Sequence, residues 1–102
     1  MGVAKSRPHC NLMAMQEAIA AEGPQAFTVK AIFGGAAMGL DIAAMLPVIA
    51  PLAPAHFYKS MTTHANRRVR QDVCHAPCPN GLAAYIKLTQ VAEHVVIQFE
   101  EK

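Results

Sequence analysis

The chain has 102 residues, of which 53% are apolar and 16% are charged, and its formal net charge is +2. This length fits a single domain over residues 1–102, and the apolar content excludes an intrinsically disordered chain. Asp41 and three prolines interrupt the apolar residues 31–55, so no run is long enough to cross about 30 Å of hydrocarbon. We therefore expect no membrane span. Without a recognisable signal sequence, and with an odd number of cysteines, a cytoplasmic location is expected.

Three helices are predicted in the alanine-rich first half of the chain. Apolar residues recur at helical spacing after Asn11, and Gly23 and Pro24 end the first helix. Thr28 and Asp41 are suitable N-caps for the other two helices. The predicted helices span residues 11–22, 29–40 and 42–52, and a short strand is possible at residues 26–29.

Two features of these helices raise questions of packing. Gly34 and Gly35 weaken the second helix by about 1 kcal/mol each relative to alanine. Either another backbone packs closely against them or the helix is loose. Pro47 lies beyond the first turn of the third helix, which predicts a kink or a break.

After Pro54 the residues become aromatic, β-branched and alternating, which favours β-strands. Short connections are expected near Ala65, at residues 76–81 and near residues 92–93, so the strands should form an antiparallel meander. The fold class is therefore α+β, with N-terminal helices packed on one face of a C-terminal antiparallel sheet. The predicted strands span residues 56–62, 67–75, 83–90 and 95–100.

Turn centres at these positions predict the register, because cross-strand partners have a constant sum of residue numbers. Lys59 then pairs with Gln71, Gln71 with Tyr85, and Tyr85 with Glu100, so that all four share one face. Lys87 and Gln98 join that face. The opposite face of the last two strands is apolar and suits contact with the helices: Ile86, Leu88, Val95, Ile97 and Phe99.

The same register has a cost in the first two strands. It places the apolar Phe57, Met61, Val69 and Val73 on the polar face, while Arg70 and Asp72 fall on the apolar one. Strong twist, a β-bulge, or helices that reach both faces would reconcile this pattern.

A lysine, an amide and a phenol on rigid strands suit the cleavage of RNA by its own 2′-hydroxyl group. Lys59 would neutralise the charge of the phosphorane, Gln71 would supply a neutral amide donor, and Tyr85 would stack a base or donate a proton. This chemistry requires no metal or cofactor. No serine-histidine-acid arrangement and no G-x-x-x-x-G-K-[ST] motif occurs.

A basic patch surrounds the first predicted hairpin. Between His56 and His75 the chain has four cationic residues and one acidic residue, Asp72. This charge fits an RNA backbone, although a solvated hairpin edge would also explain it. The residues expected to bind RNA phosphates are Arg67, Arg68, Arg70 and Lys87.

The strings "FYKSMTT", "QDV" and "YIKLT", followed by a closing "FEEK", resemble the MqsR-type toxins of bacterial type II toxin–antitoxin systems. The resemblance is strong over residues 56–102 and weaker over residues 9–55. It implies a RelE-like fold and an mRNA interferase that cleaves single-stranded RNA without the ribosome at GCU-like sites. It also implies an MqsA-like antitoxin with a zinc-bearing domain and a helix-turn-helix DNA-binding domain. The active-site positions of that family fall on Lys59, Gln71 and Tyr85.

The chain departs from that family at its fourth site position, where Glu100 replaces a lysine. A carboxylate repels phosphate, but it could act as a base toward the 2′-hydroxyl group or pair with Lys59 or Lys87. Lys102 could replace the missing cation if the chain end folds back. The alternative function is a catalytically impaired protein of the same fold that binds RNA or an antitoxin, and a homodimer stays open.

The histidines and cysteines allow weaker interpretations. Cys74 and Cys78 could bind zinc with His75 or His9, but the second ligand cluster of a structural zinc site is missing. A strand cysteine and a turn cysteine are the favoured interpretation. His64, in the first predicted turn, is expected to be a surface residue, with proton transfer as the alternative.

Overall fold

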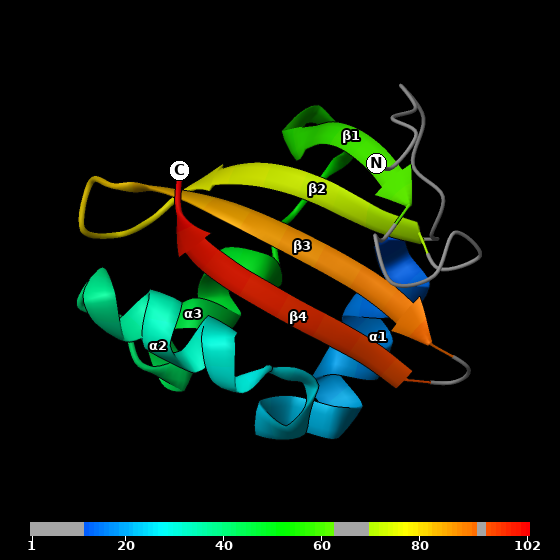
Figure 1. The fold of residues 1–102 in the computed structure, drawn as a ribbon, viewed down its shortest axis with the longest axis horizontal. Helices are drawn as coiled ribbons and strands as arrows, with labels where there is room; N and C mark the ends of the chain where they lie inside the picture. The colour runs from blue at the N-terminus through cyan, green and yellow to red at the C-terminus, as the bar shows by residue number, and fades with distance from the viewer. Residues whose placement is uncertain (1–11, 63–69, 92–93) are drawn as a thin grey trace.

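The computed structural model describes residues 12–62, 70–91 and 94–102, and it contains three α-helices followed by four strands (Figure 1). The strands form one antiparallel sheet in the order β1-β2-β3-β4, which confirms the α+β class. One short 3₁₀ segment, Gly23–Ala26, follows the first helix, and another, Pro54–His56, precedes the first strand. The main elements are α1 (Leu12–Glu22), α2 (Val29–Ala37), α3 (Ile42–Ile49), β1 (Phe57–Thr62), β2 (Arg70–Pro77), β3 (Ala83–Val91) and β4 (His94–Glu101).

The predicted helix caps are confirmed. The Thr28 hydroxyl accepts a hydrogen bond from the Ala31 N–H at 3.0 Å, and the Asp41 carboxylate accepts one from the Ala44 N–H at 2.8 Å. Both bonds satisfy N–H groups that have no partner within the helix. The α2 helix ends at Ala37, earlier than predicted, because Gly39 adopts a left-handed conformation with φ of +80°.

The α3 helix is also shorter than predicted, but Pro47 does not break it. The helix runs through Pro47 to Ile49. The side chain of Gln16 on α1 donates hydrogen bonds to the carbonyls of Ala50 and Leu52, both at 2.9 Å. These bonds satisfy carbonyl groups just beyond the end of α3 and connect it to α1.

Close packing explains the glycine pair in α2, which lies alongside β4 in Figure 1. A Cβ atom at Gly34 would overlap the carbonyl oxygen of Phe99, and one at Gly35 would overlap the thioether of Met45. Gly34 therefore lets the backbone of α2 approach the sheet, and Gly35 makes room for Met45 of α3, which answers the question that their low helix propensity raised.

The helices cover one face of the sheet, as predicted. The five apolar residues expected on that face of β3 and β4 are all buried in the core, together with Met15, Ile19 and Met45 from the helices. Phe27 also forms a parallel bridge with Ile97 at the edge of β4, where a short strand had been predicted. We call the opposite face of the sheet the distal face.

Among the described residues, no single helix is long and apolar enough to cross a membrane. The pair α2 and α3 passes the length and composition test only when joined across a bend of 94°.

The predicted register is right for the last hairpin and wrong for the other two. Tyr85 pairs with Glu100 as expected, but Lys59 pairs with Val73 and Gln71 pairs with Thr89. The first register is shifted by two residues and the second by four. Because both shifts are even, the side chains keep their predicted faces except at the start of β1.

The connection between β2 and β3 explains the larger shift. This connection is centred on Asn80, whereas the predicted register requires a centre at Cys78. The Cys78 N–H donates to the Leu82 carbonyl at 2.8 Å, and the Asn80 side chain accepts from the Leu82 N–H at 3.1 Å. Gly81, with φ of +86°, completes this tight turn.

A β-bulge at the start of β1 resolves part of the conflict between the faces. Phe57 pairs with Cys74, whereas Lys59 pairs with Val73, so the register shifts between the two. The bulge turns Phe57 toward the helix-covered face, where it lines a cavity with Cys74. Met61 and Val73 stay on the distal face, and Val73 is fully buried there.

Candidate functional site

Polar and aromatic side chains from all four strands gather on the distal face. Two neighbouring rows of cross-strand partners carry most of them. The first row is Lys59, Val73, Lys87 and Gln98, and the second contains His75, Tyr85 and Glu100. The sheet therefore brings cations, a phenol, an imidazole and a carboxylate from separate strands into one area.

The structure places three of the four predicted catalytic residues in or beside these rows. Lys59, Tyr85 and Glu100 lie there, but Gln71 pairs with Met61 and Thr89 in a third row. Gln71 is four residues from His75, the partner of Tyr85, which corresponds to about 13 Å along the strand. Gln71 and Tyr85 therefore lie on either side of the Lys59 row.

An aromatic stack forms the centre of the area. The rings of Tyr58 and His75 are stacked, with centroids 4.4 Å apart and planes at 25°. The rings of His75 and Tyr85 are tilted by 40°, with centroids 5.2 Å apart. We call these three residues the ring stack. Tyr58 is its outermost member, with 54% of its surface exposed.

Sequence reasoning missed Tyr58 and treated His75 only as a weak zinc ligand. The signal for His75 was available, because it lies on the same face as Gln71 in any register of β2. Tyr58 carried no such signal, since simple alternation puts it on the face opposite Lys59. Only the bulge brings both residues to the distal face.

Three lysines surround the ring stack. The ammonium of Lys59 lies 5.4 Å from the ring centroid of Tyr58, and that of Lys87 lies 5.8 Å from that of Tyr85. Both distances suit cation–π attraction. The Lys102 N–H donates to the Ala83 carbonyl at 2.8 Å, so the chain end continues the alternation of β4. Lys102 thus follows Glu100 on the distal face without folding back.

The surroundings of His75 favour its neutral form. Desolvation of the ring lowers the pKa of His75, and the positive charges of Lys102 and Lys59 lower the pKa further. The residue is partly buried, but its Nε2 atom is fully covered and has no hydrogen-bond partner among the described residues. An unpaired buried polar atom of this kind is uncommon, and a catalytic role is one of the explanations for it.

Glu100 has a further cation nearby. A small cavity of about 110 Å³ at the edge of β4 is lined by Lys30, Lys87 and Glu100, with Gln98 beside them. Lys30 comes from α2, so helix and sheet both contribute cations next to Glu100. The negative charge of Glu100 is therefore set among positive groups.

The predicted arginines do not gather at this site. Arg70 lies on the helix-covered face, where its guanidinium donates to the Ser60 hydroxyl at 3.3 Å and the Ser60 carbonyl at 3.2 Å. Arg67, Arg68 and His64 lie outside the described residues.

Cys74 is a strand residue and Cys78 a turn residue, as the favoured interpretation expected. Cys74 is buried on the helix-covered face, and His75 points to the distal face. Burial and the nearby Asp72 carboxylate raise the pKa of Cys74 to about 11, and burial raises the pKa of Cys78. Cys74 and His75 therefore do not share a ligand set. Within the described ranges, no three His, Cys, Asp or Glu side chains are placed to hold a metal ion.

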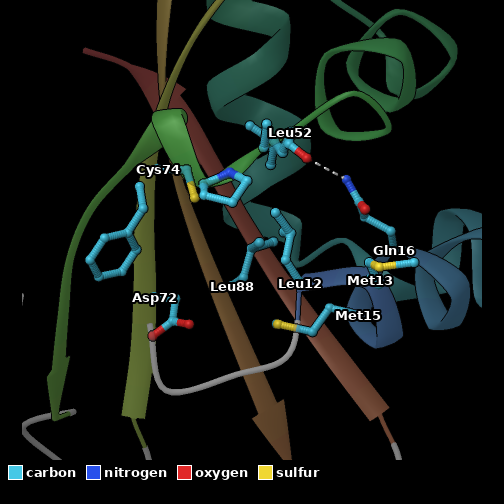
Figure 2. Close-up of a pocket in the computed structure, with 11 residues that line it drawn as sticks. Leu12, Met13, Met15, Gln16, Leu52, Asp72, Cys74 and Leu88 are labelled. Atoms are coloured by element: carbon cyan, nitrogen blue, oxygen red, sulfur yellow. Dashed lines mark hydrogen bonds between the residues drawn. The ribbon is translucent and has the colours of Figure 1, made fainter. Parts of the chain in front are cut away.

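A larger cavity of about 450 Å³ lies on the helix-covered face (Figure 2). Its walls are mostly apolar, with Leu12 and Met15 of α1 facing Cys74 and Leu88 of the sheet. Asp72 also lines it. The sheet separates this cavity from the ring stack, so it is not part of the candidate site.

Comparison with known proteins identifies the family of this chain. Residues 7–101 match the family described as "Motility quorum-sensing regulator, toxin of MqsA". The chain is also similar to the mRNA interferase toxin MqsR of Escherichia coli (strain K12), with 33% identity over 98 residues. That match covers 96% of this chain and 98% of the relative. On both matches, the chain belongs to the MqsR toxin family.

Proposed function

We propose that this chain is the toxin of a type II toxin–antitoxin system and an mRNA interferase. It would cleave single-stranded RNA without the ribosome, through attack of a ribose 2′-hydroxyl on the adjacent phosphate. The proposal rests on membership of the MqsR family and on one structural observation. Lys59 and Tyr85, which come from non-adjacent strands, share the distal face with Lys87 and Lys102.

The charges of this face suit the transition state of such a reaction. The phosphorane gains negative charge, which the ammonium groups of Lys59 and Lys102 would stabilise. The Tyr85 phenol would donate a proton to the departing 5′ oxygen. The nearby ammonium of Lys87 would stabilise the phenolate that remains. The RNA supplies its own nucleophile, so we propose a reaction that is independent of metals.

Gln71 has a different role in this proposal. Its row lies about 13 Å from that of Tyr85, which is too far for both side chains to contact one phosphate directly. Gln71 would therefore hydrogen-bond a neighbouring nucleotide of a strand that crosses the sheet. Such a contact contributes to the choice of cleavage sequence, which we propose to be GCU-like.

The proposed partners are mRNA and an antitoxin. The family description names the toxin of MqsA, which supports an MqsA-like antitoxin for this chain. We propose that this antitoxin carries a zinc-bearing domain and a helix-turn-helix DNA-binding domain.

The test uses purified protein and a single-stranded RNA with one GCU site, in EDTA and without ribosomes. We expect products with a 2′,3′-cyclic phosphate and a 5′-hydroxyl. The same RNA with a 2′-deoxy sugar at the cleaved position should stay intact, because it lacks the nucleophile. Lys59→Ala should lose at least 100-fold in rate, as for a lost oxyanion donor. An intact RNA, or equal cleavage by Lys59→Ala, contradicts the proposal.

A second candidate function is favoured by the position of Glu100. This carboxylate pairs with Tyr85 across β3 and β4, and it repels phosphate at the predicted scissile position. The chain would then bind RNA or the antitoxin without cleaving RNA. Tight binding of the intact RNA by a protein that yields no cyclic phosphate ends would support this second function.

A further inference from the structure

We propose that His75 is a further catalytic residue of this site and accepts the proton of the attacking 2′-hydroxyl group. This inference rests on the proposed function. It assigns a role to a residue at the centre of the ring stack, between Tyr58 and the predicted proton donor Tyr85.

The geometry leaves one nitrogen of His75 ready for a new hydrogen bond. Nε2 is covered by its neighbours and has no partner in the part of the chain that the structure describes. Burial without a partner is unfavourable, so a group that supplies the missing hydrogen bond is stabilised there. Lys59 and Lys102, whose charges act on His75, have long flexible side chains that can move when RNA enters. A 2′-hydroxyl is both a donor and small enough to take this place.

The charged surroundings keep the imidazole in the form that accepts a proton. The groups that face it come from three strands and the chain end: Tyr58 and Lys59 of β1, Tyr85 and Lys87 of β3, Glu100 of β4, and Lys102. Cations outnumber the single carboxylate among them. Burial and the charges of Lys102 and Lys59 lower the pKa of His75, so it is neutral near pH 7.

The protons balance with residues of this site alone. The 2′ oxygen forms a bond to phosphorus while its proton moves to His75, and the bond from phosphorus to the 5′ oxygen breaks. The 5′ oxygen takes the phenol proton of Tyr85. The imidazolium of His75 then returns a proton to the Tyr85 phenolate, whose ring centroid is 5.2 Å from its own. The products are a 2′,3′-cyclic phosphate and a 5′-hydroxyl, and both side chains are restored.

The test separates the nitrogen of His75 from its ring. His75→Phe keeps an aromatic ring in the stack but has no nitrogen, and His75→Ala leaves space for added imidazole. We expect kcat on the single-site RNA to fall by about 10²–10⁴ in both variants. The KM should change less than threefold in His75→Phe. Imidazole in the buffer should raise the rate of His75→Ala but not that of His75→Phe.

The pH profile gives a second readout. The rate of the unmodified protein should fall on the acid side with an apparent pKa below about 6.5, the ordinary value for histidine. His75→Phe should lose this fall in rate at acid pH, which we call the acid limb of the profile. His94→Asn removes a distant, exposed histidine, so it should keep both the rate and the limb.

Three outcomes overturn the inference. The first is full activity of His75→Phe, which would show that only the ring matters. The second is a low rate of His75→Phe that still falls on the acid side, together with a His75→Ala rate that added imidazole does not raise. The third is loss of the limb in Glu100→Gln instead, which would make Glu100 the base. If the unmodified protein leaves the RNA intact, the proposed function itself fails, and the inference fails with it.

Discussion

The ring of Tyr58 stacks on that of His75 at a centroid distance of 4.4 Å, although strict alternation would have put the two on opposite faces. The bulge between Phe57 and Lys59 makes this contact possible, because it turns two successive residues to the distal face. Tyr58 is thereby held by its neighbour and is still 54% exposed. A rigid, exposed aromatic ring next to lysines is a suitable platform for a nucleobase.

Tyr58→Leu is therefore expected to weaken RNA binding. Stacking of a base on an aromatic side chain contributes about 1–3 kcal/mol, so the Kd for a short single-stranded RNA should rise by roughly 5- to 150-fold. Fluorescence anisotropy with a 2′-deoxy-blocked RNA measures this without cleavage. Tyr58→Phe keeps the ring and should bind within about twofold of the unmodified protein. Equal Kd values for the leucine and phenylalanine variants would exclude stacking on this residue.

Gly34→Ala tests the close contact between α2 and β4. Helix propensity alone would make alanine more stabilising by about 1 kcal/mol. The new methyl group would overlap the Phe99 carbonyl, so we expect a loss of about 1–3 kcal/mol instead. Urea denaturation followed by circular dichroism gives the sign directly. Ala36→Gly, on the exposed side of the same helix, should cost only its propensity of about 1 kcal/mol. A stabilised Gly34→Ala protein would mean that α2 is not packed as described.

Much of this arrangement could be predicted from the sequence, because it depends on periodicity. The caps at Thr28 and Asp41 and the faces of the residues in β2, β3 and β4 follow from local patterns. The register between β2 and β3 could not be predicted, because it depends on where the turn centre lies. Asn80 fixes that centre through a hydrogen bond to Leu82 and a second one, at 2.7 Å, to the Met38 carbonyl after α2.

In the candidate site, too, the features that depend on alternation could be predicted, and those that depend on the register could not. Lys59 and Tyr85 were placed on a common face by alternation, which survives an even error in register. The predicted pairing of Gln71 with Tyr85 is wrong, because it depends on the register itself. The ring stack needed both the true register and the bulge, and a bulge has no reliable signal in a single sequence.

Glu22 connects the end of α1 to the start of β4 and should make stability depend on pH. Its carboxylate lies 2.7 Å from the His94 ring and accepts a hydrogen bond from the Val95 N–H at 3.3 Å. The hydrogen bond to His94, followed by that from Val95, lowers the pKa of Glu22 in the folded state. The stabilisation is therefore present above the unfolded pKa of about 4.3 and is lost as the pH falls through the lower folded value.

Glu22→Gln should accordingly lower the urea midpoint at pH 6 and have little effect at pH 3. The measurement is the difference in midpoint between this variant and the unmodified protein at both pH values. Glu17→Gln changes the charge of the same helix equally. Its effect on the urea midpoint should be the same at pH 6 and pH 3. A Glu22→Gln effect of the same size at both pH values would show that the carboxylate charge is not responsible.

Glu100→Lys tests whether the carboxylate beside Tyr85 limits the reaction. The change removes a negative charge and adds a positive one in the row that contains Tyr85 and His75. The phosphorane gains negative charge, so its interaction with this position changes from repulsive to attractive. We expect kcat/KM on the single-site RNA to rise on the order of tenfold, which corresponds to about 1.4 kcal/mol.

Glu101→Lys is the matched control, because it changes the net charge equally on the next residue, which points to the other face. Equal gains in both variants would indicate general attraction of RNA, whereas a loss of activity in Glu100→Lys alone would mean that Glu100 takes part in the reaction.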